Sequence, residues 1–236
     1  MARWSNAALV VTLNVLWASG QVLLQDKRSP TPGEWLANGV YLAYGLGSLD
    51  KPGKHRVSEV PSPDSAKVAL FPDGQARLIV QDRSGRELAG TEGIGIPTLS
   101  EVLWSDDSAA FAVTSSEGGW VGQWSVLVFL VDEKLVKPIC VTDQAKKDAM
   151  TRYKCNESER NEEPEMGAVA WLERSKRLLV VAQVRPHSSC YPHMGKLFGY
   201  VVSVPSGDIL ERYSEKQLRN RWRQFLGERL ERRRNH

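Results

Sequence analysis

Apolar and polar residues alternate through the middle of the chain, in the manner of half-buried β-strands. Clusters of turn-forming residues interrupt this pattern. Each can end one strand and begin the next, because Pro fixes φ, Asp bonds its own backbone and Gly accepts positive φ. The clusters are Pro72-Asp73-Gly74, Arg83-Ser84-Gly85, Asp106-Asp107-Ser108 and Pro205-Ser206-Gly207. This pattern predicts an antiparallel, mainly β domain, which we place at residues 67–213.

Five segments between these turns have the composition of strands. Some alternate in polarity, whereas two are near-continuous runs of Val, Leu, Phe and Tyr, which suit strands covered on both faces. The predicted strands are Ala76–Gln81, Ala109–Thr114, Trp124–Val131, Arg177–Val184 and Leu197–Val204. A sandwich, a barrel or a propeller accommodates such a series.

A short phrase recurs three times in this region: an apolar pair, an aromatic residue, a tight turn and an alternating strand. The copies start at Val68, Glu101 and Ala168, which are 33 and 67 residues apart. Similarity at a fixed spacing is the signature of a repeated supersecondary unit. The spacing therefore predicts one repeat length between the first and second copies and two repeat lengths between the second and third. The third copy is eroded, since Glu173-Arg174-Ser175 replaces the Asp-containing turn.

The phrase at Lys67–Gln81 and Glu101–Thr114 resembles the start of blades in bacterial TolB-like and WD40-like β-propellers, in which an aromatic residue precedes a Pro-Asp-Gly turn. The resemblance implies four-stranded blades of about 40 residues. Only three or four such units fit the predicted β region. We therefore expect a propeller-like or incomplete propeller of antiparallel blades with a C-terminal α-helix. By analogy of architecture, the resemblance also points to periplasmic immunity proteins, which bind and block toxins.

Two segments differ from the β pattern. Residues 21–66 form an N-terminal Pro/Gly-rich segment, in which Thr31-Pro32-Gly33-Glu34 has the sequence of a capping box. Residues 143–165 are dense in charged side chains and occupy the place of the missing period. This charged insertion is either an inserted loop, with a helical turn around Gln144–Met150, or a degenerate repeat.

The C-terminal residues 214–236 predict a basic amphipathic helix, from about Glu215 to Arg232. Ser214 and Gln217 have capping-box spacing. An apolar stripe follows at helical spacing: Leu218, Trp222, Phe225, Leu226 and Leu230.

This helix has three interpretations. The stripe docks on the β domain and leaves Arg219, Arg223 and Arg229 in solvent, or it contacts an anionic membrane surface, or the helix binds an acidic partner. Arg219 and Arg223 are therefore candidate binding residues, and peripheral membrane contact by the helix is one expectation.

Residues 1–20 have the sequence of a signal peptide. Arg3 precedes an apolar run from Ala7 to Ala18, and small residues at Ala18 and Gly20 suit a cleavage site. The run is shorter than the roughly 20 apolar residues of a membrane-spanning helix. We expect a periplasmic or secreted protein; an uncleaved anchor and a buried helix are the alternatives.

The composition is that of a folded globular protein, with 42% hydrophobic and 25% charged residues. The net charge of +3 is too small to indicate nucleic-acid binding by the whole protein, so no nucleic-acid partner is expected. The positive charge is concentrated after residue 214, where eight Lys or Arg face three Glu.

The three cysteines allow one disulfide and one free thiol. Cys155 and Cys190 lie in polar, loop-like segments, whereas Cys140 lies in an apolar Pro-Ile-Cys-Val stretch. We predict the Cys155–Cys190 pair.

His187, Cys190 and His193 form the one cluster of metal-ligand residue types. Imidazole and thiolate suit zinc or copper, but no fourth ligand is evident nearby, and a disulfide at Cys190 would remove the thiolate. The chain has no G-x-S-x-G, H-E-x-x-H or Walker motif, so no catalytic residue and no cofactor are assigned.

The segment Ser115–Trp124 is the more promising binding loop. Its glycines, Gly119 among them, allow a tight connection that places Trp120 near the tip. Tryptophans on loops serve as contact anchors because they bury a large area at low entropic cost. Trp124 is a weaker candidate, since its strand position favours burial.

These observations favour an exported, non-enzymatic binding protein that recognises a protein or envelope component through loops of the β domain, in concrete form an immunity or inhibitor protein. The competing class is a metal-dependent or hydrolytic envelope enzyme that uses the His187, Cys190 and His193 region.

Overall fold

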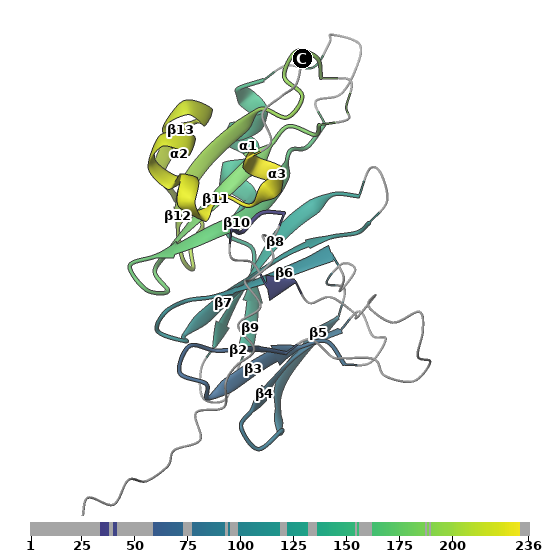
Figure 1. Ribbon diagram of the computed structural model, residues 1–236, viewed down its shortest axis with the longest axis vertical. Coiled ribbons are helices and arrows are strands. Elements are labelled where there is room, and N and C mark those ends of the chain that lie inside the picture. Colours follow the sequence, from purple (N-terminus) through teal and green to yellow (C-terminus); the bar gives the residue numbers. More distant parts are fainter. Residues whose placement is uncertain are drawn as a thin grey trace, which may run out of the picture.

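A computed structural model of the protein describes residues 34–37, 40–41, 59–72, 77–92, 94, 99–118, 122–131, 136–153, 155, 162–186, 188 and 190–231. This part of the chain is mainly β, as predicted. Three antiparallel sheets lie face to face along the long axis of the molecule, and short helices flank the third sheet (Figure 1). The signal-peptide prediction for residues 1–20 lies outside the described residues.

Each sheet contains four consecutive strands, each paired with the next, because short turns join antiparallel neighbours, and the second sheet has a fifth strand at its edge. The first sheet is β2 (Glu59–Pro61), β3 (Lys67–Leu70), β4 (Arg77–Asp82) and β5 (Glu87–Glu92). The second is β6 (Ser100–Trp104), β7 (Ala110–Ser116), β8 (Trp124–Val131) and β9 (Val136–Ile139), with β1 (Val40–Tyr41) beside β6. The third is β10 (Glu165–Leu172), β11 (Arg177–Gln183), β12 (Leu197–Ser203) and β13 (Ile209–Ser214).

Aromatic side chains fill the layer between the first and second sheets. Phe111 and Phe129 stack with ring centroids 4.6 Å apart, and the Trp104 ring lies 4.6 Å from Phe111. Leu78 and Val80 cover them from the first sheet. Because all five are buried, this layer holds the two sheets together through hydrophobic burial.

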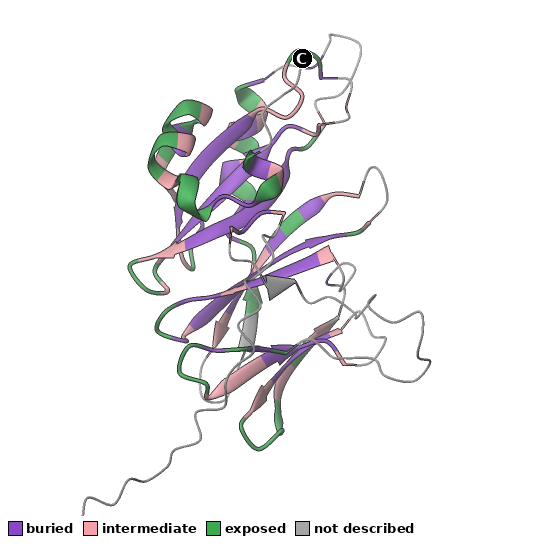
Figure 2. Cartoon of the chain, in the orientation of Figure 1, coloured by how far each residue is buried: buried purple, intermediate pink, exposed green. Residues whose placement is uncertain are grey.

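The layer between the second and third sheets also contains a helix, α1 (Asp143–Thr151). Its small buried residues Ala145 and Ala149 pack beside Val128 of the second sheet and Tyr200 of the third. The prediction of a helical turn within the charged insertion is thereby confirmed. Figure 2 shows the resulting buried interior running through the stacked sheets.

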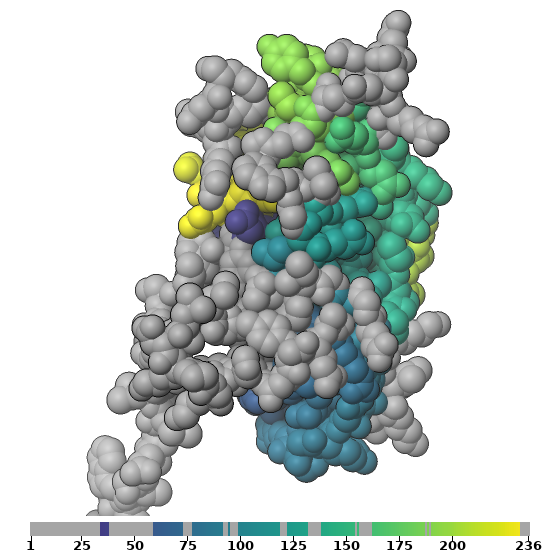
Figure 3. Space-filling model, turned by 90° about the vertical axis from the view of Figure 1, so that its right-hand side faces the viewer, coloured from purple at the N-terminus to yellow at the C-terminus, as the bar shows by residue number. Residues whose placement is uncertain are grey.

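The outer face of the third sheet is covered by the C-terminal elements α2 (Glu215–Trp222), a 3₁₀ turn η2 (Arg223–Phe225) and α3 (Glu228–Glu231). Leu218, Leu226 and Leu230 are fully buried there, beside Trp35 from the N-terminal side. In the space-filling view, the blue first sheet lies at one end of the molecule and the green third sheet at the other (Figure 3).

The sheet order fits the blade of the resembled propellers, but a propeller ring is not confirmed. The described strands form no closed sheet, and helices cover the outer face of the third sheet, where a further blade would pack. The described fold is three stacked antiparallel sheets.

The structure corrects the register of the first repeat copy. Val68 lies in the second of the four consecutive strands of its sheet, whereas Glu101 and Ala168 lie in the first of the four consecutive strands of theirs. The true counterpart of the turn after Trp104 is the turn at Ser62. The Ser62 hydroxyl accepts a hydrogen bond from Lys67 N–H (3.0 Å), and the Ser105 hydroxyl accepts one from the corresponding Ala110 N–H (3.0 Å).

The corrected spacing explains the long second interval. The turns at Ser62 and Ser105 are 43 residues apart, close to one blade of about 40 residues. Trp104 and Trp171 are 67 residues apart because α1 and the rest of the charged insertion lie between the second and third sheets. The interval therefore contains an insertion, and no degenerate repeat is present in its described part.

The aromatic residue of the phrase has a structural role. The indole N–H of Trp104 donates to the carbonyl oxygen of Val60 (3.0 Å), and that of Trp171 donates to the carbonyl oxygen of Leu103 (2.9 Å). Both acceptors lie in the first strand of the preceding sheet. Each tryptophan therefore fixes its sheet against the previous one.

The C-terminal helix is shorter than predicted. Ser214 and Gln217 form the expected capping box, which confirms where the helix begins. The helix then ends, because the polypeptide pairs with the N-terminal segment: Leu226 bridges to Leu36, and Gly227 N–H donates to the carbonyl oxygen of Trp35 (2.8 Å). Strand β2 and the Trp35 segment, both within the predicted N-terminal Pro/Gly-rich segment 21–66, thus belong to the folded body.

Candidate functional site at one end of the sheets

Three connections with no sequence in common meet at one end of the second and third sheets. They are the described residues of the β7–β8 loop (117–118 and 122–123), of the second half of the β9–β10 connection (152–153, 155 and 162–164) and of the β11–β12 loop (184–186, 188 and 190–196). In antiparallel sheets with short turns, the second connection and the connection to the next sheet lie at the same end. We call these described residues the loop end.

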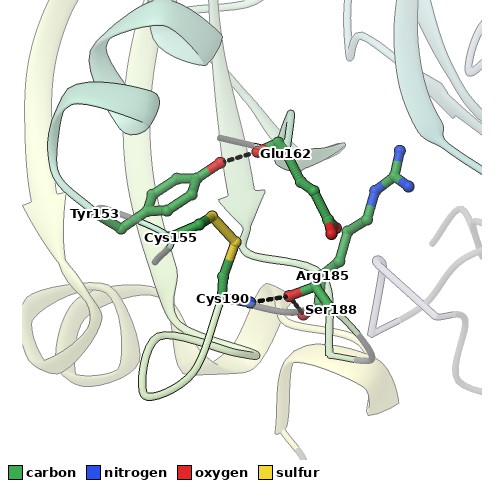
Figure 4. The surroundings of a disulfide bond; sticks show 6 residues. All are labelled: Tyr153, Cys155, Glu162, Arg185, Ser188 and Cys190. Atoms are coloured by element: carbon green, nitrogen blue, oxygen red, sulfur yellow. Dashed lines mark hydrogen bonds between the residues drawn. A yellow bond between two sulfur atoms is a disulfide. The ribbon is translucent and has the colours of Figure 1, made fainter. Parts of the chain in front are cut away.

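A disulfide joins two of these connections. Cys155 and Cys190 are 35 residues apart in sequence and form the predicted disulfide bond. Cys190 is fully buried, and its N–H donates to the Ser188 hydroxyl (3.3 Å) while that hydroxyl donates to the Arg185 carbonyl oxygen (3.0 Å) (Figure 4). The β11–β12 loop is therefore cross-linked to the charged insertion.

Tyr153 supports the disulfide from the insertion side. Its ring is buried, and its hydroxyl donates to the carbonyl oxygen of Glu162 (Figure 4). Burial, together with the negative charges of Glu162 and Glu163, raises the pKa of Tyr153 to about 12. The phenol is thus a neutral hydrogen-bond donor that closes the insertion on itself.

Glu163 joins the insertion to the β7–β8 loop. Its carboxylate accepts hydrogen bonds from the Gln123 amide (2.8 Å) and from the Lys146 ammonium (2.9 Å). These bonds lower the pKa of Glu163, so the carboxylate is charged at neutral pH. The loop that contains the predicted anchor Trp120 is in this way held beside the insertion.

Tyr191 is the most exposed large hydrophobic residue in the described part of the chain, with 65% of its surface accessible. It follows the buried Cys190 directly, and His193 N–H donates to the Cys190 carbonyl oxygen (2.6 Å) to close the turn around it. An aromatic residue on a cross-linked turn loses little conformational freedom when it binds. Tyr191 was not among the predicted site residues, although its position next to a predicted disulfide cysteine was a signal.

The structure separates the two predicted tryptophans. Trp120 and Gly119 lie outside the described residues. Trp124 begins β8 and is buried, with its ring centroid 5.9 Å from that of Trp35 and the Arg229 guanidinium 5.7 Å from its ring. Trp124 is therefore a core residue, and the surface role suggested for it is not supported.

The two predicted arginines lie on the helical cover of the third sheet. Arg219 bonds the carboxylate of Glu215 (3.0 Å) and the carbonyl oxygen of Leu230 (2.6 Å), so its guanidinium joins α2 to α3. Arg223 is exposed, and its Nε lies 3.6 Å from the Glu231 carboxylate. The docking interpretation of the helix agrees with the burial of Leu218, whereas Arg229, expected in solvent, is mostly buried against Glu165.

The metal-ligand cluster loses its thiolate. Cys190 is bonded to Cys155, and His187 lies outside the described residues, which leaves His193 of the three. Among the residues that the structure places, no group of three or more His, Cys, Asp or Glu is arranged to hold a metal ion.

The carboxylate of Asp107, in the turn after Trp104, has a structural role. It accepts hydrogen bonds from the hydroxyls of Ser105 (2.7 Å) and Ser175 (2.9 Å).

The Cys155–Cys190 bond is of the kind found in proteins that fold in oxidising, extracytoplasmic compartments. None of the described helices has the length and apolar character needed to cross a bilayer.

No protein-family model matches this sequence, and a search of curated proteins also finds no match.

Proposed function

We propose that the protein is an exported, non-enzymatic binding protein that recognises a protein partner in the cell envelope through the loop end. The observation that carries this proposal is the exposure of Tyr191 on a turn fixed by the Cys155–Cys190 bond. Tyrosine is enriched among residues that dominate binding energy, because it combines a large apolar surface with a polar hydroxyl.

The surroundings of Tyr191 support a role in binding. The Glu163 contacts with Gln123 and Lys146, together with the disulfide, connect three separate segments into one end of the molecule. Rigid connections lower the entropy lost on association. The turns at Ser62 and Ser105, which are alike, lie at the other end of the sheets. The connections at the loop end, in contrast, have no sequence in common.

An immunity or inhibitor protein is the concrete form of this proposal. Such a protein needs a preformed surface and an oxidising location, and the loop end and the disulfide suit both. The enzyme alternative has lost the Cys190 thiolate that its metal site required, and no observation favours it.

Photo-crosslinking in envelope extract tests the proposal. Benzoylphenylalanine at position 191 is compared with the same residue at position 84, because Ser84 is exposed in the β4–β5 turn at the other end of the sheets. We expect one adduct of defined mass from position 191, which excess wild-type protein suppresses and excess Tyr191→Ala protein does not. No adduct at 191, or the same adducts at both positions, would contradict the proposal.

A further inference from the structure

Arg185 is the one positively charged group with an unsatisfied, solvent-excluded donor among the described residues. Three buried side-chain nitrogens there have no hydrogen-bond partner: the indole nitrogens of Trp35 and Trp222 and the Nε of Arg185. A hydrogen bond to a charged group is worth more than one to a neutral group, so the Arg185 donor is the costliest of the three to leave unmade.

The position of Arg185 is set by the loop end itself. It follows β11 as the second residue of the β11–β12 loop, and its carbonyl oxygen accepts the hydroxyl of Ser188, which in turn accepts Cys190 N–H. Its side chain points away from the disulfide and from Tyr153 (Figure 4). The guanidinium is thereby held on a backbone that the Cys155–Cys190 bond fixes.

The Glu163 carboxylate near Arg185 is engaged elsewhere. Glu163 is close enough for the Arg185 charge to lower its pKa, yet the carboxylate accepts its hydrogen bonds from Gln123 and Lys146. In the described part of the chain, no carboxylate forms an ion pair with Arg185. The residue is partly exposed, and its two terminal guanidinium nitrogens are not among the solvent-excluded atoms, so a ligand can reach these terminal nitrogens from solvent.

We infer that Arg185 binds a carboxylate of the partner, supplied by an acidic side chain or by the partner's C-terminal residue. Guanidinium presents N–H groups in a planar fork that matches the two oxygens of a carboxylate. The inference rests on the proposed function, because the carboxylate belongs to the partner that Tyr191 contacts. It adds the chemical class that the partner must present beside an apolar contact.

The arginine Nε–H resonances of the full-length, oxidised protein provide a direct test. The Arg185 peak is identified by its loss in Arg185→Lys, and the Arg83 peak serves as the internal control, because Arg83 Nε already donates to the Ser65 carbonyl oxygen (2.7 Å). Sodium acetate is titrated against sodium chloride at matched ionic strength. Saturable movement of the Arg185 peak with acetate alone, with the Arg83 peak unmoved, supports the inference; no movement, or equal movement with chloride, overturns it.

Two blocked peptides distinguish the source of the carboxylate. One is Gly-Glu-Gly with an amidated C-terminus, and the other is Gly-Gly-Gly with a free C-terminus. Movement with the first assigns an acidic side chain, movement with the second assigns a terminal carboxylate, and movement with neither overturns the inference. The peptides do not depend on the partner, so this result stands whether or not crosslinking at position 191 succeeds.

The crosslinking assay also distinguishes a failure of the Arg185 inference from a failure of the proposed function. Arg185→Met is expected to weaken competition with the wild-type protein by about tenfold or more, since a charge-assisted hydrogen bond is lost. Unchanged competition by Arg185→Met, alongside lost competition by Tyr191→Ala, would leave the proposed function intact and refute the inference.

Discussion

The buried carboxylate of Glu101, in β6, accepts a hydrogen bond from the backbone N–H of Trp35 (3.1 Å), 66 residues earlier in the sequence. A second oxygen accepts the N–H of Leu36 (3.1 Å). Hydrogen bonds from backbone N–H groups to a carboxylate are stronger than those to a neutral acceptor. The N-terminal segment is thus tied to the second sheet as well as to the C-terminal elements.

Glu101→Gln should destabilise the protein by about 1–3 kcal/mol, because an amide oxygen replaces the charged acceptor and the amide donors need new partners. Urea unfolding monitored by tryptophan fluorescence measures the change. Glu87→Gln is the matched control: Glu87 pairs with Arg77 at the surface, where an ion pair contributes less than about 1 kcal/mol. Equal effects of the two substitutions would show that the Glu101 contacts do not stabilise the fold.

Arg229 is the second buried charge that holds the termini together. Its guanidinium pairs with Glu165, donates to the Gln183 amide oxygen (2.5 Å), and lies 5.3 Å from the Trp35 ring. Arg229→Met should cost about 3–5 kcal/mol, because Glu165 would keep a buried charge without its cation.

Arg212→Met provides the comparison for Arg229→Met. Arg212 pairs with Asp148, but half of its side chain is exposed, so a loss below about 1 kcal/mol is expected. The double variant Glu165→Gln with Arg229→Met should recover part of the loss, since both charges are then removed. A double variant that is less stable than Arg229→Met alone would contradict the burial argument.

Gly167 in β10 leaves room for Trp35. A Cβ at position 167 would lie 2.0 Å from the Trp35 ring, so Gly167→Ala should destabilise by about 1–3 kcal/mol through overpacking. In Trp35→Ala protein the same substitution should cost much less, since the ring is gone. Additive effects in a thermal-denaturation cycle would mean that the two residues are not in contact.

Loss of the disulfide should cost about 2–4 kcal/mol, since the bond closes a loop over a sequence separation of 35 residues. The variant Cys155→Ser with Cys190→Ser, studied by urea unfolding, measures this loss. Hydrogen exchange should increase chiefly in residues 184–196 and in the insertion. Cys140→Ser is the control, because Cys140 is an exposed free thiol.

The raised pKa of Tyr153 predicts that the folded protein loses stability at alkaline pH. Its pKa is raised from about 10 to about 12 in the folded protein, so the folded state holds the proton more tightly than the unfolded state. The resulting stabilisation is complete below about pH 10 and is lost as the pH rises towards about 12. Tyr153→Phe should make this part of the pH profile of the midpoint temperature less steep, and an unchanged profile would contradict the argument; Tyr200 and Tyr213, whose pKa values are also raised by burial, retain their contributions.

Most of the β architecture was predictable, because its signals are local. The strand Trp124–Val131 and the capping box at Ser214 depend on neighbouring residues, and both were predicted correctly. The register of the first repeat was wrong, although Ser-x-Asp-Ser-Ala occurs at residues 62–66 and 105–109. That turn places its serine hydroxyl on the backbone five residues later and was the better guide.

The loop end was only partly predictable. Composition was enough to favour the Cys155–Cys190 pair, but the exposure of Tyr191 depends on how a distant insertion packs beside its loop. The free Nε of Arg185 is a property of its surroundings and has no sequence pattern. Arg229 was expected in solvent because its partner Glu165 lies 64 residues away.

The bridge between Leu36 and Leu226 has a consequence for the timing of folding. A ribosome makes Leu36 190 residues before Leu226, so the cover of the third sheet cannot close until Leu226 has been made. The first two sheets contain only contacts available earlier, and they can form while the rest is still being made. Closure of this cover must then wait for α2, η2 and α3, and a polypeptide that stops before Leu226 would lack the contacts that Leu226 and Gly227 make with Leu36 and Trp35.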